Sequence, residues 1–162
     1  MSNNIEIERK FLVTSDRWMA KTYSKKTIIQ GYMSVQPAVR VRLQDNKALI
    51  TIKSSEPGMT RSEFEYEIPY EDGVEMTKKI EMGLIEKTRY YVHDADLTWE
   101  IDVFHGDNEG LVVAEIELPS EDTEIPQHSW LGKEVTDASE YYNAHLSVLP
   151  YRLWKDYLIF KY

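Results

Sequence analysis

Charged and apolar side chains alternate along most of this 162-residue chain, and this period of two strongly constrains its fold. Successive side chains of a β-strand point to opposite faces, so residues at i, i+2 and i+4 share one face. The alternation, read between turn residues, predicts eight short strands. Their ranges are 4–12, 25–34, 38–45, 47–54, 61–68, 86–93, 97–104 and 111–118. An even number of strands suits a closed antiparallel barrel.

Three helices are predicted between and after these strands, at 15–22, 70–82 and 137–149. Each has acidic residues near its start, where they suit the positive end of the helix dipole. The apolar strand faces are bulky enough to be covered from outside by these helices, which would turn the charged face inward. The expected fold is therefore mainly β, a closed eight-stranded antiparallel barrel with helices packed outside. Because no linker or repeat interrupts the chain, we expect one domain over residues 1–162.

The C-terminal segment, 150–162, is aromatic and apolar beyond what an unattached terminus needs. We expect it to pack on the barrel as a docked helix or strand. A contact between two subunits is the alternative, and it would make the protein a homodimer.

One face of the predicted strands collects charges of the same sign at alternate positions. For any single strand, the alternative is a solvated sheet face, which also alternates polar with apolar residues. Runs such as Glu63, Glu65 and Glu67 differ, because a neutral solvated face has no reason to accumulate one sign. An interior that holds both signs is costly unless each charge has a partner or a bound ion. The pattern therefore predicts an enclosed channel that binds a polyanion together with metal.

Composition limits the partners of such a channel. The net charge of −9 argues against a broad basic surface, so no nucleic-acid partner is expected. An acidic exterior can still surround basic residues concentrated in a cleft. The absence of cysteine excludes a disulfide scaffold, a thiolate zinc site and a cysteine nucleophile. Because no apolar stretch approaches bilayer length and the start lacks a secretory signal, we expect a cytoplasmic protein without a membrane partner.

The predicted lining also indicates a chemistry. Arginine and lysine neutralise the oxygens of a polyphosphate, and arginine adds forked donors. Carboxylates repel phosphate, so their natural role is to hold a hard cation, Mg²⁺ or Mn²⁺, that bridges to the phosphates. Together these groups would stabilise the charge on a transferring phosphoryl group, with water as the only nucleophile required.

The charged strands carry seven motifs that resemble, in the same order, those of the CYTH superfamily, the triphosphate tunnel metalloenzymes. The first is Glu6-Ile7-Glu8-Arg9-Lys10-Phe11, which is similar to the ExExK signature. The others are Val39-Arg40-Val41-Arg42, Thr51-Ile52-Lys53, Glu65-Tyr66-Glu67, Glu86-Lys87-Thr88-Arg89, Glu100-Ile101-Asp102-Val103-Phe104 and Ala114-Glu115-Ile116-Glu117. The resemblance covers residues 4–149 and looks most like the bacterial inorganic triphosphatase branch. It implies an eight-stranded tunnel and metal-dependent hydrolysis of triphosphates.

The resemblance also implies roles for the matching residues. Metal would be held by Glu6 and Glu8, joined by some of Glu65, Glu67, Asp102, Glu115 and Glu117. The phosphates would be held by Lys10, Arg40, Arg42, Lys53 and Arg89. The catalytic candidates are Lys87 and Arg89. Lys87 matches the lysine proposed in bacterial relatives as the base that prepares water, a role that requires a lowered pKa; otherwise it is a further phosphate clamp.

Two further segments resemble the bacterial branch. Tyr32, in Gln30-Gly31-Tyr32, would be a gate at a tunnel mouth, with a packed aromatic as the alternative. Tyr141-Tyr142-Asn143 resembles part of the family's C-terminal helix and is expected to be structural. The four histidines form no recognisable ligand spacing, so we do not expect them to bind metal.

The expected activity is cleavage of the terminal phosphate of inorganic triphosphate (tripolyphosphate), or of a related triphosphate, by attack of water. A shared fold does not choose among the activities of a superfamily. Adenylyl cyclase and thiamine triphosphatase are therefore the alternative enzymes. Outside the enzymes, the pattern also fits a polyphosphate or nucleotide sensor without turnover, and a phosphate-binding interaction domain.

Overall fold

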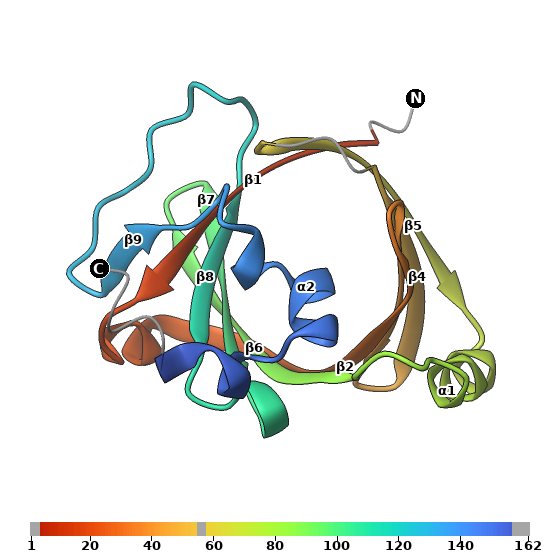
Figure 1. Cartoon of the computed structure of the whole chain (residues 1–162). Helices are drawn as coiled ribbons and strands as arrows, with labels where there is room; N and C mark the ends of the chain where they lie inside the picture. The colour runs from red at the N-terminus through yellow and green to blue at the C-terminus, as the bar shows by residue number, and fades with distance from the viewer. Residues whose placement is uncertain (1–3, 55–57, 157–162) are drawn as a thin grey trace.

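The computed structural model describes residues 4–54 and 58–156, and its charged strands close into a ring (Figure 1). The ring consists of β1 (Ile5–Val13), β2 (Thr22–Val35), β3 (Ala38–Gln44), β4 (Lys47–Lys53), β5 (Thr60–Ile68), β6 (Ile85–Asp94), β7 (Leu97–Phe104) and β8 (Val112–Glu117). Neighbouring strands are antiparallel in the order β5-β4-β3-β2-β6-β7-β8-β1, and β1 pairs back with β5. The closed eight-stranded antiparallel barrel predicted from the alternation is confirmed.

Strand β1 closes the ring because its two halves have different partners. At its start, Glu6 lies opposite Arg61 of β5, within a short run of three residue pairs. From Glu8 onward, β1 pairs with β8. A ninth strand, β9 (Leu131–Glu134), pairs with the end of β1 and extends the sheet beyond the ring. The sequence did not predict β9, because these four residues contain Gly132 and show no alternation.

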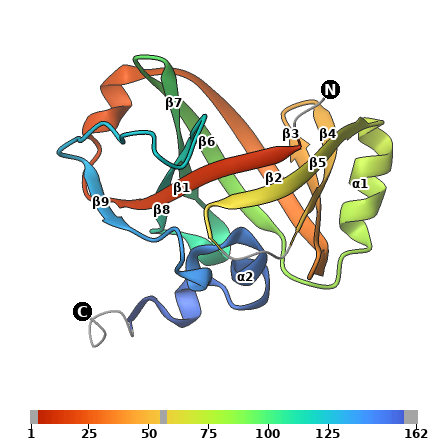
Figure 2. The same cartoon turned by 90° about the horizontal axis from the view of Figure 1, so that it is seen from above.

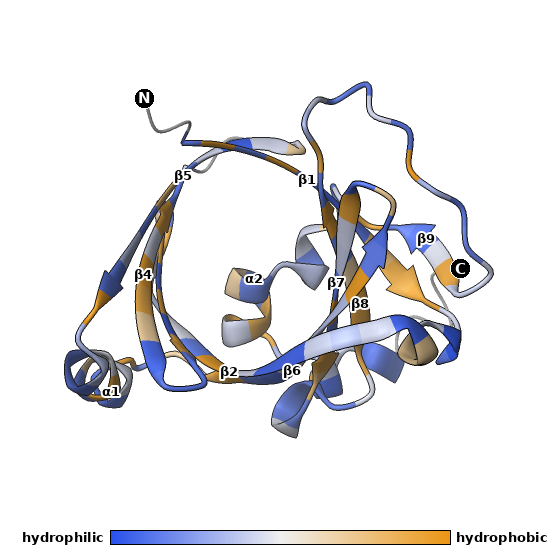
Figure 3. Ribbon diagram, turned by 180° about the vertical axis from the view of Figure 1, so that it is seen from behind, coloured by the Kyte–Doolittle hydropathy of each residue, from blue (hydrophilic) through white to orange (hydrophobic). Residues whose placement is uncertain are grey.

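The apolar strand faces point out of the ring and form much of the core there. Trp99 of β7 has no exposed surface, and Trp18 and Trp130 belong to the same hydrophobic cluster. Trp18 lies on the 3₁₀ helix η1 (Arg17–Lys21), which takes the place of the helix predicted at 15–22. Figure 3 shows hydrophilic and hydrophobic residues following one another along the strands. Packing outside the ring leaves the charged face to line its interior.

Helix α1 (Tyr70–Lys78) packs outside the barrel, against β3 and β4 (Figure 2). It begins where predicted and ends four residues short of the predicted 82. A Cβ on Gly73 would come within 2.5 Å of the Ala48 Cβ, so a larger residue could not pack here without a shift. Within the described ranges, no helix is long and apolar enough to span a bilayer.

Helix α2 (Asn143–Val148) falls within the outline of the ring in Figure 1 and lies at one end of the barrel in Figure 2, so it borders the tunnel there and does not cover an outer strand face. It follows the 3₁₀ helix η3 (Ser139–Tyr141), and the two replace the single helix predicted at 137–149. Asn143 explains the position, because its side chain accepts hydrogen bonds from Gln30 and Lys87 on the inner face of the barrel. Apolar periodicity alone does not reveal such polar anchoring.

The C-terminal segment continues from α2 into the 3₁₀ helix η4 (Tyr151–Leu153). The ring of Trp154 meets the buried Tyr141 ring edge-on at 5.3 Å. The Tyr151 N–H donates to Asn108 of the 3₁₀ helix η2 (Gly106–Asn108) at 2.8 Å. The part up to residue 156 thus packs near the α2 end of the barrel, and residues 157–162 lie outside the described residues.

Candidate active site

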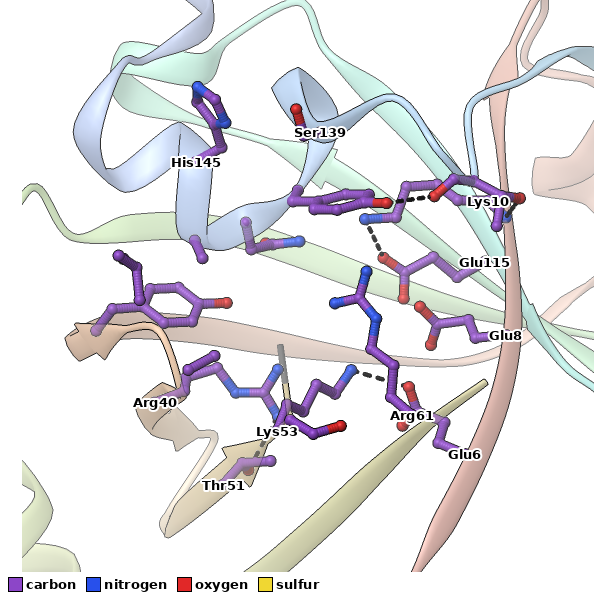
Figure 4. Close-up of a pocket in the computed structure, with 18 of the residues that line it drawn as sticks. Glu6, Glu8, Lys10, Arg40, Thr51, Lys53, Arg61, Glu115, Ser139 and His145 are labelled. Carbon is purple, nitrogen blue, oxygen red and sulfur yellow. Dashed lines mark hydrogen bonds and ion pairs between the residues drawn. The ribbon is translucent and has the colours of Figure 1, made fainter. Parts of the chain in front are cut away.

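Two adjoining cavities occupy the interior of the barrel. The larger, about 580 Å³, reaches α2, and the smaller, about 290 Å³, reaches the opposite end near Tyr91 and Glu100. Both are lined by the same central residues: Glu6, Glu8, Arg40, Arg42, Lys53, Arg89 and Glu115. Figure 4 shows side chains of both signs facing one another in the larger cavity. Most of the ionisable residues predicted to face an enclosed channel therefore converge there.

Arginines from β3 form one wall of this tunnel. The Arg40 Nη2 donates to Thr51 Oγ1 at 3.0 Å, while its buried Nε has no hydrogen-bond acceptor among the described residues. Burial, together with the charges of Arg40 and Arg89, lowers the pKa of Arg42 to about 10. A donor without an acceptor and crowded positive charges both favour an anionic ligand at this wall.

Lysines connect the basic wall to carboxylates on β1 and β8. Lys53 Nζ lies 2.8 Å from Glu6 Oε1, and Lys10 Nζ lies 3.3 Å from Glu115 Oε1 (Figure 4). Burial opposes the charge of Lys53, but Glu8 and Glu6 together raise its pKa above the ordinary value. Both signs are thus held in the same space, as a ligand that carries phosphate and metal would require.

The carboxylates of β1 and β8 repel one another. Burial and the charges of Glu115 and Glu6 raise the pKa of Glu8 well above its usual range. Burial and the charges of Glu6 and Glu100 likewise raise the pKa of Glu117. A divalent cation would relieve this repulsion, and carboxylate oxygens are the ligands that Mg²⁺ and Mn²⁺ prefer, so the donor set fits such an ion. No three carboxylate or histidine side chains in the described ranges already lie in a metal-binding arrangement.

Lys87 lies in a fully buried ion-pair cluster. Its Nζ is 2.7 Å from Asp102 Oδ2, and Arg89 donates to both oxygens of Asp102 at 2.7 and 2.9 Å. Burial outweighs the nearby Asp102 and, with the charges of Arg89 and Arg42, lowers the pKa of Lys87 to about 7. Although burial opposes it, the two cations lower the pKa of Asp102, which stays ionised. The cluster therefore holds a lysine whose neutral form is accessible near neutral pH.

The whole described barrel corresponds to one family. The family model described as the CYTH domain matches residues 4–150. The chain belongs to the CYTH family. The resemblance inferred from seven strand motifs is thereby confirmed.

Relatives of this CYTH protein include two bacterial proteins named inorganic triphosphatase. The one from Acetivibrio thermocellus is 41% identical over 155 residues, which is 93% of this chain and 98% of that protein. The one from Nitrosomonas europaea is 34% identical and covers 88% of this chain and 97% of its own. A crystal structure of an inorganic triphosphatase superimposes with a TM-score of 0.65 at 31% identity, covering 91% of this chain and 96% of that one.

Most of the predicted site residues of this CYTH chain line the tunnel. Those at one or both cavities are Glu6, Glu8, Lys10, Tyr32, Arg40, Arg42, Lys53, Glu65, Lys87, Arg89, Glu115 and Glu117. Two others differ: Glu67 lines neither cavity and is exposed, and Asp102 lies beneath Lys87 and Arg89 without exposed surface. Tyr32 faces the α2 end and is only 5% exposed.

Several residues that line or support this CYTH site were missed from the sequence. Arg61 of β5 lines the larger cavity, with its guanidinium 4.8 Å from the centre of the Tyr142 ring. Arg61 lies two residues before Glu63 and four before Glu65 on the same strand, so its side chain points to the same inner face. This period of two is the signal that could have identified it from the sequence. The buried Gln30 and the half-buried Asn143, which contact each other beside Lys87, are uncharged, so the charge pattern did not reveal them.

Proposed function

We propose that this CYTH protein is a divalent-metal-dependent phosphohydrolase that cleaves the terminal phosphate of inorganic triphosphate. The observation that carries the proposal is the shared centre of the two cavities, where cations and carboxylates line one enclosed space. The relative at 41% identity, named inorganic triphosphatase, supports the same activity. No nucleic acid or membrane takes part in the proposed reaction.

The phosphate chain would lie along the basic side chains of the tunnel. Its proposed ligands are Lys10, Arg40, Arg42, Lys53 and Arg89, and Arg61 adds a cation that the sequence pattern did not reveal. The Nε donor of Arg40, which has no acceptor within 4–54 and 58–156, supports this placement, because a phosphate oxygen would supply one. Tyr32 would limit access at the α2 end.

The proposed metal ligands are Glu6, Glu8 and Glu117, with Glu65 and Glu115 beside them. Asp102 is left out because both of its oxygens already accept hydrogen bonds from cations. Glu67 is left out because it lines neither cavity. Mg²⁺ or Mn²⁺, when bound, would supply positive charge to the phosphate oxygens and the leaving group.

Lys87 is proposed as the base. The oxygen of a water molecule bonds to the terminal phosphorus while the bond from that phosphorus to the bridging oxygen breaks, and that electron pair leaves with pyrophosphate. The proton of the water passes to the Lys87 Nζ and later to solvent. The pKa of about 7 leaves this amine partly neutral at neutral pH, as a base requires. Its side chain has no exposed surface, so a neighbouring side chain must move to admit water.

Phosphate release tests the function. Tripolyphosphate, ATP and thiamine triphosphate would each be incubated with Mg²⁺, with Mn²⁺ and with a chelator, and cyclic AMP would be measured in the ATP sample. We expect metal-dependent release that is fastest from tripolyphosphate. Cyclic AMP without phosphate release would identify a cyclase, faster release from thiamine triphosphate a thiamine triphosphatase, and binding without turnover a sensor.

Three further predictions accompany this function. They are a single tunnel domain over residues 1–162, a location in the cytoplasm, and assembly into a homodimer. Sedimentation analysis of the purified chain would decide the oligomeric state, and fractionation of the source cells would decide the location.

A further inference from the structure

Four side chains form a hydrogen-bonded chain at the α2 end of the tunnel. Arg42 Nε donates to Gln30 Oε1 at 2.8 Å, and Gln30 Nε2 donates to Asn143 Oδ1 at 3.0 Å. Lys87 Nζ donates to the same Asn143 oxygen at 2.9 Å. Gln30 has no exposed surface and Lys87 is 1% exposed, while Asn143 is half-buried and borders the larger cavity.

The donor and acceptor roles along these hydrogen bonds follow from Arg42. A guanidinium can donate hydrogen bonds but cannot accept one, so Gln30 must present its oxygen to Arg42. The Gln30 amide nitrogen then faces Asn143, which must present its own oxygen in return. Oxygen and nitrogen of an amide are normally hard to tell apart by shape, but here the fixed charge of Arg42 determines both orientations.

This direction constrains the amine of Lys87. Its Nζ contacts two oxygens, Asp102 Oδ2 at 2.7 Å and Asn143 Oδ1 at 2.9 Å, and both can only accept. A neutral amine has two N–H bonds, which these two acceptors occupy. Its lone pair must then take another tetrahedral direction, away from Asp102 and Asn143. Lys87 also lines the larger cavity, so that direction is the one left for a reacting water once a neighbouring side chain has moved to admit it.

We propose that Asn143 is a positioning residue whose carboxamide oxygen, oriented by Gln30, aims the lone pair of Lys87 into the tunnel. The inference rests on the proposed function, with Lys87 as its base. It gives helix α2 a part in the reaction, because Asn143 is the first residue of that helix. Gln30 also contacts Arg42, a proposed phosphate ligand. Substrate binding at Arg42 is thereby connected, through Gln30 and Asn143, to the orientation of the base.

The test compares three variants in steady-state hydrolysis of tripolyphosphate. Asn143→Leu removes the acceptor at similar volume, and we expect kcat to fall about 10- to 100-fold, the scale on which misplacement of a catalytic group slows a reaction. KM should change by less than about threefold, because no phosphate contact is removed. Asn143→Asp keeps an acceptor oxygen but favours the ammonium form, so its kcat should recover toward the wild-type value as pH is raised.

Asn108→Leu is the matched control. Asn108 is an asparagine with a buried side chain, 3% exposed, and its Oδ1 accepts from Tyr151 outside the tunnel. We expect this change to lower Tm and leave kcat unaltered. An equal loss of kcat in Asn143→Leu and Asn108→Leu would overturn the inference, as would failure of Asn143→Asp to recover at high pH. If the wild-type protein releases no phosphate, the proposed function itself fails, which is a different result.

The proposed orientation of the Gln30 side chain can also be tested without measuring turnover. The side-chain amide protons of Gln30 should exchange slowly with solvent in the wild-type protein, measured by NMR, and faster in Asn143→Leu. Fast exchange in both proteins would show that Gln30 does not donate to Asn143 and would overturn the proposed orientation.

Discussion

Glu8 of β1 and Glu117 of β8 are directly opposite partners in an antiparallel pair. Like charges at such positions destabilise a sheet, whereas an opposite-charge pair there stabilises it by roughly 0.2–1 kcal/mol. Burial adds to this cost, since it raises the pKa of both carboxyl groups. A cation bound between the two carboxylates would reduce their repulsion. Metal binding should therefore raise the free energy of unfolding.

The Glu8→Gln substitution should separate the two effects. Without metal we expect a higher Tm, because one of the repelling charges is lost. Affinity for Mg²⁺ and Mn²⁺ should fall about tenfold or more, equivalent to about 1.4 kcal/mol or more. Differential scanning fluorimetry and titration calorimetry would measure both. Glu75→Gln on the exposed face of α1 is the control, and a similar metal affinity in the two variants would argue against Glu8 as a ligand.

Lys87→Met should slow the chemical step more than it weakens binding. General bases contribute about 10²- to 10⁴-fold to rate, so kcat should fall within that range. A base acts when neutral, so the wild-type kcat should rise with pH through about 7, and the variant should lack this rise. Lys53→Met, which removes a proposed phosphate ligand, should mainly raise KM. Equal kinetic profiles in the two variants would make Lys87 a further clamp.

The same lysine should affect stability as a function of pH. Its folded pKa of about 7 lies below the ordinary 10.5, so between these values the unfolded chain binds more protons than the folded one. The contribution of Lys87 to the free energy of unfolding therefore increases as pH rises from about 7 to 10.5, and its full cost is present below pH 7. Urea titrations across this range should show a flatter dependence in Lys87→Met than in the wild type.

Asp102→Asn should be strongly destabilising. It leaves the buried Lys87 and Arg89 without their shared carboxylate, and removal of one partner from a buried ion pair costs about 3–5 kcal/mol. Asp107→Asn removes the partner of Arg152 at the surface, where about 0–1 kcal/mol is expected. Urea unfolding of the two variants gives both values. If Asp102 were instead needed only for metal, its loss would leave metal-free stability nearly unchanged.

Arg40→Lys should weaken substrate binding while keeping the charge. Lysine cannot reproduce the forked donors, including the Nε that has no acceptor among the described residues. We expect KM for tripolyphosphate to rise about tenfold, the equivalent of roughly one charge-assisted hydrogen bond. Arg9→Lys, at a pair with Glu134 on the outer face, should leave KM unchanged and serves as the control.

The barrel and most of its lining could be predicted because alternate residues of a strand point to opposite faces, so the sequence pattern distinguishes the inner from the outer face. This alternation correctly placed Glu8, Arg42 and Lys53 in the tunnel. The alternation could not say which charges pair: Asp102, which the family resemblance placed among the candidate metal ligands, accepts hydrogen bonds from Lys87 and Arg89. Nor could it place α2, because the hydrogen bonds of Asn143 join segments more than fifty residues apart.

The strands that pair with β1 all follow it in the sequence, which affects how the enzyme folds during synthesis. Strand β1 is synthesised before β5, β8 and β9, the strands that it pairs with, and β9 ends only at Glu134. On the ribosome, Glu6 can therefore meet Lys53 and Arg61 once β5 has emerged, whereas Glu8 must wait for its strand partner Glu117 in β8. Such distant contacts form slowly, so catalytic competence should be among the last properties that a newly made molecule acquires.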